Sequence, residues 1–547
     1  MCGISLLKLR RQDAALGLSM ISLLLEKQHN RGQDGAGIAI WKEHAEPGTP
    51  YFRVEKSDAS NPLADVIGKC RKAPFDGEIF LGHLRYGTFG NRGVDACHPL
   101  VRISACRNRT LLLAGNFNLT NSATLLEKFA AAGHHLCDSQ DTSILLHMIG
   151  HELEKNPEQP LVNALRAAAS QWDGGYLICG ITGDGNAFAL RDPAGIRPGF
   201  FHVSEDHAAV ASERPPLQAV FNLKSSEVTE IPPGHVLIFS KDGTVSLEKC
   251  LEPAEKRSCV FERVYFSRGN DRDIQQERRA MGRLLVPGII EAVDRDLENC
   301  FFSYIPNTAR SCFFGILDEL LHHSRNLRFG ELVIKDAKFR TFIADEQSRE
   351  SFGMHVYDVV HGMIRPGRDK LVVVDDSIVR GNTVRNMLLR VLDRLDPDKI
   401  VIGSAAPPVC YPDCYGIDMA SLGELVAFQA AVSFLEKQGK SDLIHQCAAA
   451  AEADLRKADG EMENRVLPIY QEVGFRNLCG EITELLTPPG LRAKFEVVFQ
   501  TPENLRACCP GHTGDWYFSG HYPTPGGNRV VNRALLNFVN HIKRRAY

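Results

Sequence analysis

The stretch LVVVDDSIVRGNT, residues 371–383, indicates how the second half of the chain folds. Its four leading apolar residues predict a strand that is buried on both faces. The residues after it have helical spacing, and a second apolar run, KIVIGSAA, follows at 399–406. A strand–loop–helix–strand unit with parallel strands is therefore expected. Such a unit places the loop at the carboxyl end of its strand, where open α/β sheets bind ligands.

The loop carries the side chains of a sugar-phosphate site. Asp375 and Asp376 suit ribose hydroxyls, either directly or through Mg²⁺. Ser377 and Thr383 add hydroxyl donors, and Gly381 permits close approach of the backbone. The N-terminus of the following helix attracts a phosphate. The alternative is an ordinary helix cap after a core strand, in which the Asp and Ser side chains only cap the helix.

The composition describes a soluble, globular chain with more than one domain. Its 547 residues are too many for a single hydrophobic core. Its formal net charge of −4 argues against nucleic-acid binding through bulk positive charge. No run of 18 apolar residues occurs, and basic residues interrupt the first apolar stretch, so neither a membrane span nor a signal peptide is expected. The 16 cysteines include no CxxC pair. We expect reduced thiols and a cytoplasmic location.

The pattern of apolar runs divides the chain. Short apolar runs broken by Gly, Asn and Asp predict strands through the first 245 residues. Helices are predicted near 14–28 and 140–155, where apolar residues recur at three and four. The polar stretch LEPAEKRS, at 251–258, predicts a boundary. Domains are therefore expected at 2–245 and 259–460, followed by a helical or irregular extension at 461–547.

The second residue, Cys2, has the chemistry of an N-terminal nucleophile. Removal of Met1 would leave the thiol and a free α-amine on one residue, and no propeptide is expected because only Met1 precedes Cys2. Reference pKa values of about 8.5 for a thiol and about 7.7–8.0 for an α-amine allow the amine to accept the thiol proton near neutral pH. The alternative is an unremarkable thiol.

Later motifs contribute side chains that could complete an amide-transfer site. Arg85 in HLRYGT and Asp141 in SQDTSILL could clamp the α-carboxylate and the α-amine of an amino acid. Asn116 in GNFNLTN could hold an oxyanion together with a neighbouring backbone N–H. Taken alone, Arg85 could be a surface ion-pair partner, Asn116 a turn residue and Asp141 a helix cap.

Together these motifs resemble those of the class II glutamine amidotransferases, and with the loop at 371–383 they resemble the amidophosphoribosyltransferase family. The first half contributes MCGI, RGQDGAGI, HLRYGT, NLTN and WDGGYLICG…RDPAGIRPGFF, and the second half contributes FERVYFSRGNDRDI, SYIPNT and YGIDM. The resemblance covers roughly residues 2–425. It implies an N-terminal nucleophile (Ntn) hydrolase αββα sandwich followed by a type I phosphoribosyltransferase domain with a parallel sheet.

The resemblance also implies a reaction. Glutamine would aminate 5-phosphoribosyl 1-diphosphate (PRPP) to 5-phosphoribosylamine, the first committed step of de novo purine synthesis. Cys2 would form a γ-glutamyl thioester and release ammonia, which passes internally to PRPP and displaces pyrophosphate with the help of Mg²⁺. The resemblance further implies a homo-oligomer, either a dimer or a tetramer, and purine nucleotides as feedback inhibitors.

The site residues implied by the resemblance fall into three groups. The catalytic positions are Cys2, Asn116 and Phe117. The glutamine-binding positions are Arg31, Arg85, Tyr86, Thr88 and Asp141. The PRPP-binding positions are Asp375, Asp376, Ser377, Val379, Arg380, Gly381, Asn382 and Thr383, with Lys335, Lys338 and Arg340 as cations for pyrophosphate. Asp375 and Asp376 would hold Mg²⁺, with Ser377 as a further candidate.

The chain departs from the family pattern at three places. Phe117 stands where the family commonly has the second Gly of NGNLTN. The segment expected to close over PRPP, KDAKFRTFI at 335–343, is one residue shorter than usual, and acidic residues follow it where relatives are basic. Asp413 in YPDCYGID replaces a Cys that ligates an iron–sulfur cluster in some members, and the terminal CxxC is missing. We expect no cluster.

Two other functions remain open at this point. A glutamine amidotransferase that serves a different acceptor would lose the loop DDSIVRGNT, which is intact here. A PRPP or nucleotide sensor without catalysis would keep both binding sites, and Phe117 and the altered closing segment favour it. Release of glutamate and of pyrophosphate, measured on the same sample, separates the three functions.

Overall fold

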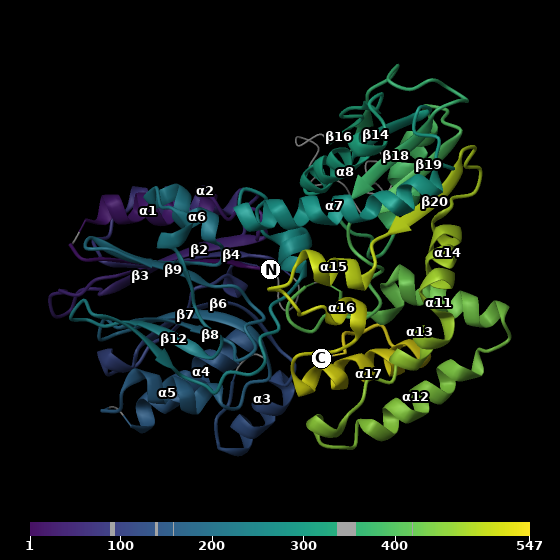
Figure 1. Cartoon of the computed structure of the whole chain (residues 1–547). Coiled ribbons are helices and arrows are strands. Elements are labelled where there is room, and N and C mark those ends of the chain that lie inside the picture. Colours follow the sequence, from purple (N-terminus) through teal and green to yellow (C-terminus); the bar gives the residue numbers. More distant parts are fainter. Residues whose placement is uncertain are drawn as a thin grey trace.

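The computed structural model describes residues 1–11, 13–87, 93–136, 140–156, 158–335, 357–417 and 419–546. Figure 1 shows two bodies side by side, the first built from the purple and blue part of the chain and the second from the teal, green and yellow part. Within the described ranges, no helix has the length and apolar character that crossing a membrane requires.

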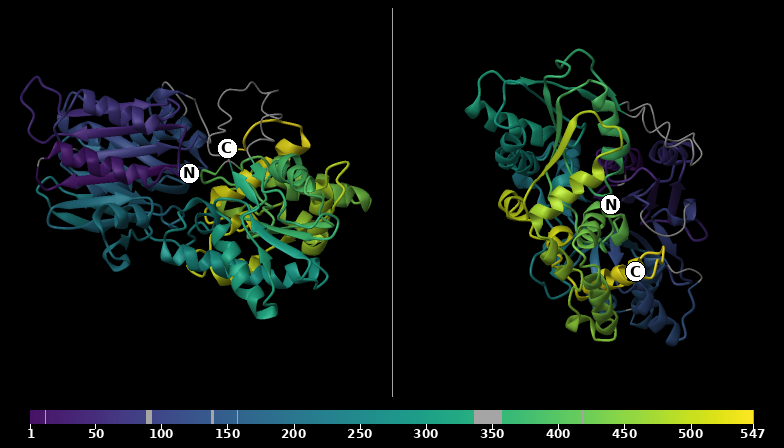
Figure 2. Two further views of the ribbon diagram at one scale, coloured as in Figure 1. Left: turned by 90° about the horizontal axis from the view of Figure 1, so that it is seen from above. Right: turned by 90° about the vertical axis from the view of Figure 1, so that its right-hand side faces the viewer.

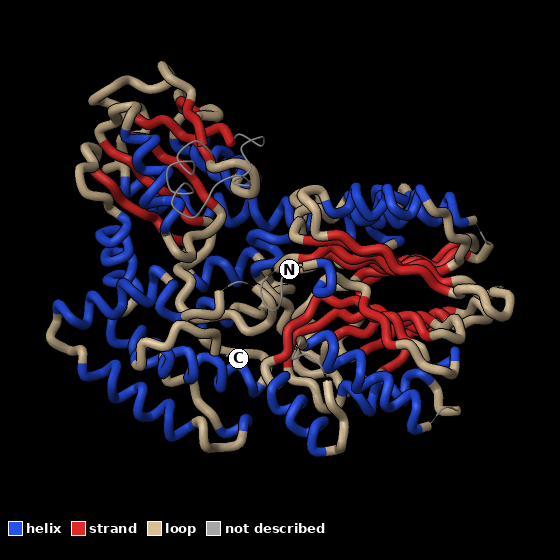
Figure 3. Tube along the Cα trace, turned by 180° about the vertical axis from the view of Figure 1, so that it is seen from behind, coloured by secondary structure: helices blue, strands red, loops and turns tan. Residues whose placement is uncertain are grey.

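Two antiparallel sheets stacked face to face form the N-terminal body, as Figure 3 shows from behind. The seven strands of the first sheet are, in order, β11 (Thr229–Glu230), β9 (Phe200–Val203), β10 (His207–Ala211), β1 (Gly3–Leu9), β4 (Ile79–Arg85), β2 (Gly35–Trp41) and β3 (Phe52–Ser57). The six strands of the second sheet are β13 (Val245–Lys249), β12 (His235–Phe239), β8 (Ala187–Arg191), β7 (Gly174–Thr182), β6 (Leu111–Leu119) and β5 (Leu100–Arg102).

Helices cover the outer face of each sheet (Figure 1). The first sheet carries α1 (Ala14–Glu26), α2 (Pro62–Lys72) and α6 (Arg214–Phe221), and the second carries α3 (Ser122–Ala131), α4 (Asp141–Lys155) and α5 (Leu161–Ala169). Because helices cover the outside, the central strands are buried on both faces and read as continuous apolar runs. The predicted αββα sandwich is confirmed, and the helices predicted near 14–28 and 140–155 are α1 and α4.

A parallel sheet organises the second body. Its five strands are β15 (Arg328–Phe329), β14 (Cys300–Tyr304), β18 (Lys370–Asp375), β19 (Lys399–Ser404) and β20 (Lys494–Phe499), and all of its pairings are parallel. Its neighbours include α7 (Arg272–Ala292), α8 (Arg310–His323) and α10 (Leu389–Asp393), with a small hairpin of β16 (Val333–Lys335) and β17 (Tyr357–Val359). The segment from β18 to β19 is the strand–loop–helix–strand unit that the opening stretch predicts.

The division predicted at residue 460 does not match this sheet. Strand β20 pairs with β19, so the sheet takes its last strand from the segment 461–547 that was expected to be helical or irregular. The sequence KFEVVF has polar residues only at its first and third positions, and several of its residues are partly exposed because β20 is an edge strand. Further α-helices in the described part of the second body are α11 (Val426–Lys437), α12 (Asp442–Asp454), α13 (Leu467–Val473), α14 (Phe475–Leu486), α15 (Pro502–Cys508), α16 (Trp516–Ser519) and α17 (Pro525–Val539).

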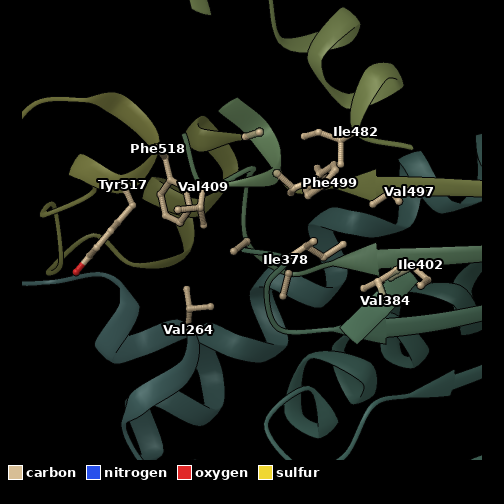
Figure 4. Close-up of a cluster of buried hydrophobic side chains, with 14 of the residues drawn as sticks. Val264, Ile378, Val384, Ile402, Val409, Ile482, Val497, Phe499, Tyr517 and Phe518 are labelled. Carbon is tan, nitrogen blue, oxygen red and sulfur yellow. The ribbon is translucent and has the colours of Figure 1, made fainter. Parts of the chain in front are cut away.

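One hydrophobic cluster joins the parallel sheet to the C-terminal helices and to the N-terminal body. Ile402 pairs with Val497 on the neighbouring strand, and in Figure 4 Phe518 lies beside Val409. The same cluster includes Met1, which is 1% exposed. Figure 2 accordingly shows both chain ends at the junction between the two bodies.

Candidate active sites

Cys2 lies just before β1, next to strand β4. Its backbone N–H donates to Asn116 Oδ1 at 3.1 Å, and the N–H of Tyr86 donates to its Sγ at 3.5 Å. Gly3 pairs with Leu84 in the sheet, so Cys2 faces the end of β4. Tyr86 and Asn116, which are far apart in the sequence, thus meet at Cys2, the first at its thiol and the second at its backbone N–H.

The side-chain amide of Asn116 is held in one orientation. Its Oδ1 accepts the N–H of Cys2, which leaves Nδ2 as the remaining donor. Among the described residues this buried Nδ2 has no hydrogen-bond partner. An unsatisfied buried donor costs about 1–3 kcal/mol, and donors of this kind beside a nucleophile stabilise the oxyanion of a tetrahedral intermediate.

Phe117 fits its position as an ordinary strand residue. It lies in β6, opposite Tyr176, and is not among the residues with a positive φ. Its ring lies over Gly115, where an added Cβ would stand only 2.3 Å from Phe117 Cδ1. The absence of a side chain at position 115 therefore makes room for the phenylalanine that replaces the family's glycine.

Arg85 ends β4 and is 9% exposed. The segment RGQDG packs beside it: the Asp34 N–H donates to the Arg85 carbonyl at 3.0 Å, and Asp34 Oδ2 accepts from the Gly87 N–H at 2.8 Å. A Cβ on Gly32 would lie 2.6 Å from the Arg85 backbone, so only glycine fits there. Asp34 and Gly32 therefore position the loop after β4, a role that the sequence analysis missed. Thr88 lies outside the described residues.

Asp141 is the first residue of α4 and lies close to the strand that carries Asn116. Its Oδ2 accepts the N–H of Leu119 at 3.2 Å. Burial raises the pKa of this carboxyl group to about 6. A buried carboxylate of this kind favours a cationic partner, such as the α-ammonium group of an amino acid.

Arg31 lies in a buried ion-pair network. Its Nε contacts Glu213 Oε1 at 2.5 Å and its Nη2 contacts Glu262 Oε2 at 2.6 Å, and the side chain is 0% exposed. Glu262 follows the predicted domain boundary, so this network ties the N-terminal body to the second body. These contacts are structural, and a role of Arg31 in glutamine binding stays a prediction.

A cleft of 860 Å³ lies at the carboxyl end of β18. The loop residues 375–384, including Asn382 and Thr383, form one wall, and the segment 305–308 lies beside them. Tyr86 and Tyr265 extend the wall toward the N-terminal body, and Lys335 contributes a cation. The other two predicted cations, Lys338 and Arg340, lie outside the described residues.

The two carboxylates of the loop are buried and adjacent. Burial and the charge of Asp376 raise the pKa of Asp375 well above its usual value, and burial raises the pKa of Asp376 to about 6. Ser377 Oγ donates to Asp376 Oδ1 at 2.9 Å. Oxygen donors that repel each other in this way fit Mg²⁺, which is commonly bound by one or two carboxylates and by substrate phosphates. In the described ranges no group of three or more His, Cys, Asp or Glu residues could hold a metal ion.

The rest of the loop is shaped by its neighbours. Gly381 has φ of 75°, a left-handed conformation that favours glycine. The carbonyl of Val379 accepts the N–H of Val426 at 3.0 Å, and the Arg380 guanidinium pairs with Glu424 at 2.9 Å. Val426 and Glu424 belong to one segment, which therefore fixes the outer side of the loop.

Tyr86 connects the two sites. Its backbone contacts the thiol of Cys2, and the same residue lines the cleft that holds Asp375 and Asp376. Its ring packs edge to face against Phe266, with centroids 6.3 Å apart. The nucleophile and the phosphate cleft are therefore separated by a single residue of the loop after β4.

Asp413 is fully engaged by its surroundings. Its Oδ1 accepts from Trp516 Nε1 at 3.1 Å, and its Oδ2 accepts the N–H groups of Tyr415 at 3.0 Å and Ile417 at 2.5 Å. Nearby, the thiol of Cys259 lies 3.2 Å from the hydroxyl of Tyr517. This hydrogen-bonded arrangement does not supply the thiolates of an iron–sulfur cluster. That the protein contains no cluster stays a prediction.

The family model for class II glutamine amidotransferases matches residues 4–188. Two solved structures share the fold at 23% sequence identity: glutamine PRPP amidotransferase from B. subtilis complexed with ADP and GMP, and an allosteric regulatory enzyme of purine biosynthesis. The first has a TM-score of 0.69 and covers 96% of this chain and 97% of its own, and the second has a TM-score of 0.70 and covers 96% of each.

Curated relatives are similar over most of their length. The amidophosphoribosyltransferase of Haemophilus influenzae is 30% identical over 427 residues, which cover 75% of this chain and 80% of the relative. The chloroplastic amidophosphoribosyltransferase 1 of Arabidopsis thaliana is 28% identical over 77% of this chain and 70% of the relative. With its amidotransferase sandwich, its phosphate loop and this level of identity, the chain belongs to the amidophosphoribosyltransferase family.

Proposed function

We propose that the chain converts PRPP, glutamine and water into 5-phosphoribosylamine, glutamate and pyrophosphate by two coupled reactions. The position of Tyr86 is the main support for assigning these residues to two adjoining sites. Tyr86 contacts the thiol of Cys2 and also lines the cleft that contains Asp375 and Asp376. The two sites therefore adjoin at Tyr86, and ammonia released at the first site would pass beside this residue to reach the second.

In the first reaction, the thiol of Cys2 attacks the side-chain amide carbon of glutamine. The α-amine that Cys2 gains on removal of Met1 takes the thiol proton and passes it to the departing ammonia. Nδ2 of Asn116 and the N–H of Phe117 stabilise the oxyanion. Arg85 holds the α-carboxylate and Asp141 holds the α-ammonium group. Water then cleaves the γ-glutamyl thioester, and glutamate leaves.

In the second reaction, ammonia attacks C1 of PRPP as the bond from C1 to the pyrophosphate oxygen breaks, and the new amine loses a proton. Asp375 and Asp376 would hold Mg²⁺, which when bound offsets the charge of the leaving pyrophosphate. Thr383 donates to the 5-phosphate, as Ser377 would once its hydroxyl turns away from Asp376, and the left-handed Gly381 allows the backbone to approach the phosphate. Lys335 contributes positive charge on the pyrophosphate side.

Purine nucleotides are proposed as inhibitors at this cleft. The related B. subtilis enzyme is described as complexed with ADP and GMP. A nucleotide carries a ribose 5-phosphate, as PRPP does, so the loop at 375–383 can accept its phosphate group by the same contacts.

The test is a measurement of glutamate and pyrophosphate from glutamine, PRPP and Mg²⁺, on protein whose N-terminus has been checked by mass. We expect the two products in equal amounts. Cys2→Ala should abolish glutamate release and keep pyrophosphate release when ammonia is supplied. Glutamate without pyrophosphate would point to another acceptor, and the absence of both products, with Met1 removed, would favour a sensor without catalysis.

A further inference from the structure

Two histidines lie side by side in the interior of the N-terminal body, and the proposed reaction makes no use of them. His83 belongs to β4 and is 0% exposed, and His98 precedes β5 and is 9% exposed. Their ring centroids are 4.3 Å apart, and the ring of His98 also stacks on that of Phe117 with centroids 6.1 Å apart. The pair therefore lies against β6, the strand that carries Asn116.

Both rings bond to the backbone of Gly115 in β6. Strand β5 ends its pairing with β6 at Leu113, two residues before Gly115. At Gly115 the carbonyl oxygen lies 3.2 Å from His83 Nε2, and the N–H donates to His98 Nδ1 at 3.3 Å. The two imidazoles thus take the place of a paired strand, and they satisfy both backbone groups of the residue before Asn116.

These bonds determine which ring nitrogens carry a proton. A carbonyl oxygen can only accept, so His83 donates from Nε2, and an N–H can only donate, so Nδ1 of His98 accepts. Burial lowers the pKa of both imidazoles, to about 3 for His83, so each ring carries one proton at neutral pH. The proton of His98 is therefore on Nε2, which lies 2.8 Å from Thr142 Oγ1 and donates to it.

One hydrogen-bonded series, the histidine bridge, therefore connects three elements of the N-terminal body. Its members are His83, Gly115, His98 and Thr142. Each of the three elements also carries a proposed glutamine contact. In β4, Arg85 follows the bridge by two residues. In β6, Asn116 is the next residue after the bridge, and in α4, Asp141 is the residue before it.

Glycines on two strands make room for the bridge. A Cβ on Gly37 in β2 would lie only 2.1 Å from the carbonyl oxygen of His98, so only glycine fits there. A Cβ on Gly115 would meet the ring of Phe117, on which His98 stacks. His98 is therefore held between the two sheets, with its backbone against the first and its ring against the second.

We infer that His98 is a positioning residue of the glutamine site and acts on two different groups through its two ring nitrogens. Its Nδ1 fixes Gly115 and, with it, the Asn116 amide that donates to the oxyanion. Its Nε2 fixes Thr142 and, with it, the Asp141 carboxylate that holds the α-ammonium group. The oxyanion contact forms only in the transition state, so its loss lowers kcat. The ammonium contact is already made by bound glutamine, so its loss raises KM. These consequences rest on the proposed function.

Two substitutions separate the two ring nitrogens, because a glutamine amide reaches the place of Nε2 and an asparagine amide the place of Nδ1. His98→Gln keeps the bond to Thr142 and loses the bond to Gly115. It should lower glutaminase kcat at least about tenfold and leave the KM for glutamine nearly unchanged, since a misplacement of about 1 Å can cost about 10²-fold.

His98→Asn keeps the bond to Gly115 and loses the bond to Thr142. It should raise the KM for glutamine at least about fivefold and leave kcat nearly unchanged. A histidine that only fills space in the core would give the same kinetic change in both variants. Two variants that change kcat and KM alike would therefore overturn the inference.

Matched controls come from His207 in β10, whose Nδ1 lies 3.1 Å from Ser204 Oγ and which is not part of the bridge. His207→Gln and His207→Asn should leave both kinetic parameters for glutamine unchanged. Pyrophosphate release driven by added ammonia should match wild type in every variant, because no member of the bridge lines the PRPP cleft. That rate also shows that a variant has folded.

Thr142→Val removes the bond to His98 Nε2 from the other side. It should raise the KM for glutamine as His98→Asn does, and the two changes combined should raise it no further, because both remove one hydrogen bond. Effects on KM that multiply would overturn the inference. If the His98 variants do not fold, Thr142→Val decides alone, and an unchanged KM would overturn it. A wild type that releases no glutamate refutes the proposed function, and this inference falls with it.

Discussion

Replacement of Asn116 by alanine tests the assignment of the first site most directly. The amide accepts the N–H of Cys2 through Oδ1, so its buried Nδ2 has one available use, donation to the developing oxyanion. Loss of one such donor in other enzymes costs about 2.7–4 kcal/mol, which corresponds to a factor of about 10²–10³ in kcat. We expect a loss of this size in glutaminase kcat for Asn116→Ala.

The assay follows glutamate release at saturating glutamine, with PRPP and Mg²⁺ present, and compares it with pyrophosphate release driven by added ammonia. The second rate should stay within about twofold of wild type, because Asn116 lies outside the phosphate cleft. A glutaminase kcat within about fivefold of wild type, or an equal loss of the ammonia-driven rate, would refute the oxyanion role.

Asn118 offers a matched control two residues along the same strand. Its Nδ2 is already bonded to the carbonyl of Cys414 at 2.7 Å and so cannot serve the oxyanion. Asn118→Ala should lower stability by about 0.5–1.5 kcal/mol, the net contribution of one hydrogen bond, and should leave the chemical step nearly intact. If both alanine variants lose glutaminase activity equally, the effect comes from disturbance of β6 rather than from a missing donor.

Three further outcomes are expected. Asp376→Asn should abolish pyrophosphate release with either nitrogen source while glutamate is still formed, and an ammonia-driven rate close to wild type would contradict the role of this carboxylate. Burial raises the pKa of Asp141 to about 6, and only its ionised form attracts an α-ammonium group. We therefore expect kcat/KM for glutamine to fall as the pH drops below about 6. A flat pH profile of kcat/KM between about pH 5 and 7 would argue against that contact. Thr524→Val removes a hydrogen bond of 2.5 Å to the carboxylate of Asp173, so urea denaturation should show a loss of about 1.5–3 kcal/mol, and an unchanged midpoint would mean that this contact does not hold the C-terminal segment.

The sequence predicts those parts of the fold whose pattern follows from burial. The run LVVV at 371–374 is apolar at every position because β18 lies in the middle of a parallel sheet, and the loop after it could be located with the same reasoning. Strand β20 was not predicted because it is a short edge strand that follows its partner β19 by more than ninety residues. Local patterns do not reveal such a distant pairing.

The candidate sites divide in a similar way. Cys2 and Asn116 could be named from their motifs, because nucleophile and oxyanion chemistry require particular residue types. Gly32 and Asp34 act by packing against the backbone of Arg85, and no local pattern shows which segment a glycine will touch. The ion-pair partners of Arg31 could not be predicted from the sequence either, because they lie about 180 or more positions further along the chain and only the three-dimensional fold brings them together.

The burial of Met1 sets an order of events during synthesis. Its side chain packs in a cluster with Ile196 and Val260, and its sulfur contacts Arg197. A ribosome that adds about 5–20 residues per second reaches Val260 on the order of 13–50 s after it has added Met1, and only then can this cluster close. The proposed chemistry needs the amine of Cys2, so an aminopeptidase must act within that interval. Chains that fold first would keep their methionine out of its reach, and a preparation made at high expression rates would contain a fraction of stable but unprocessed protein.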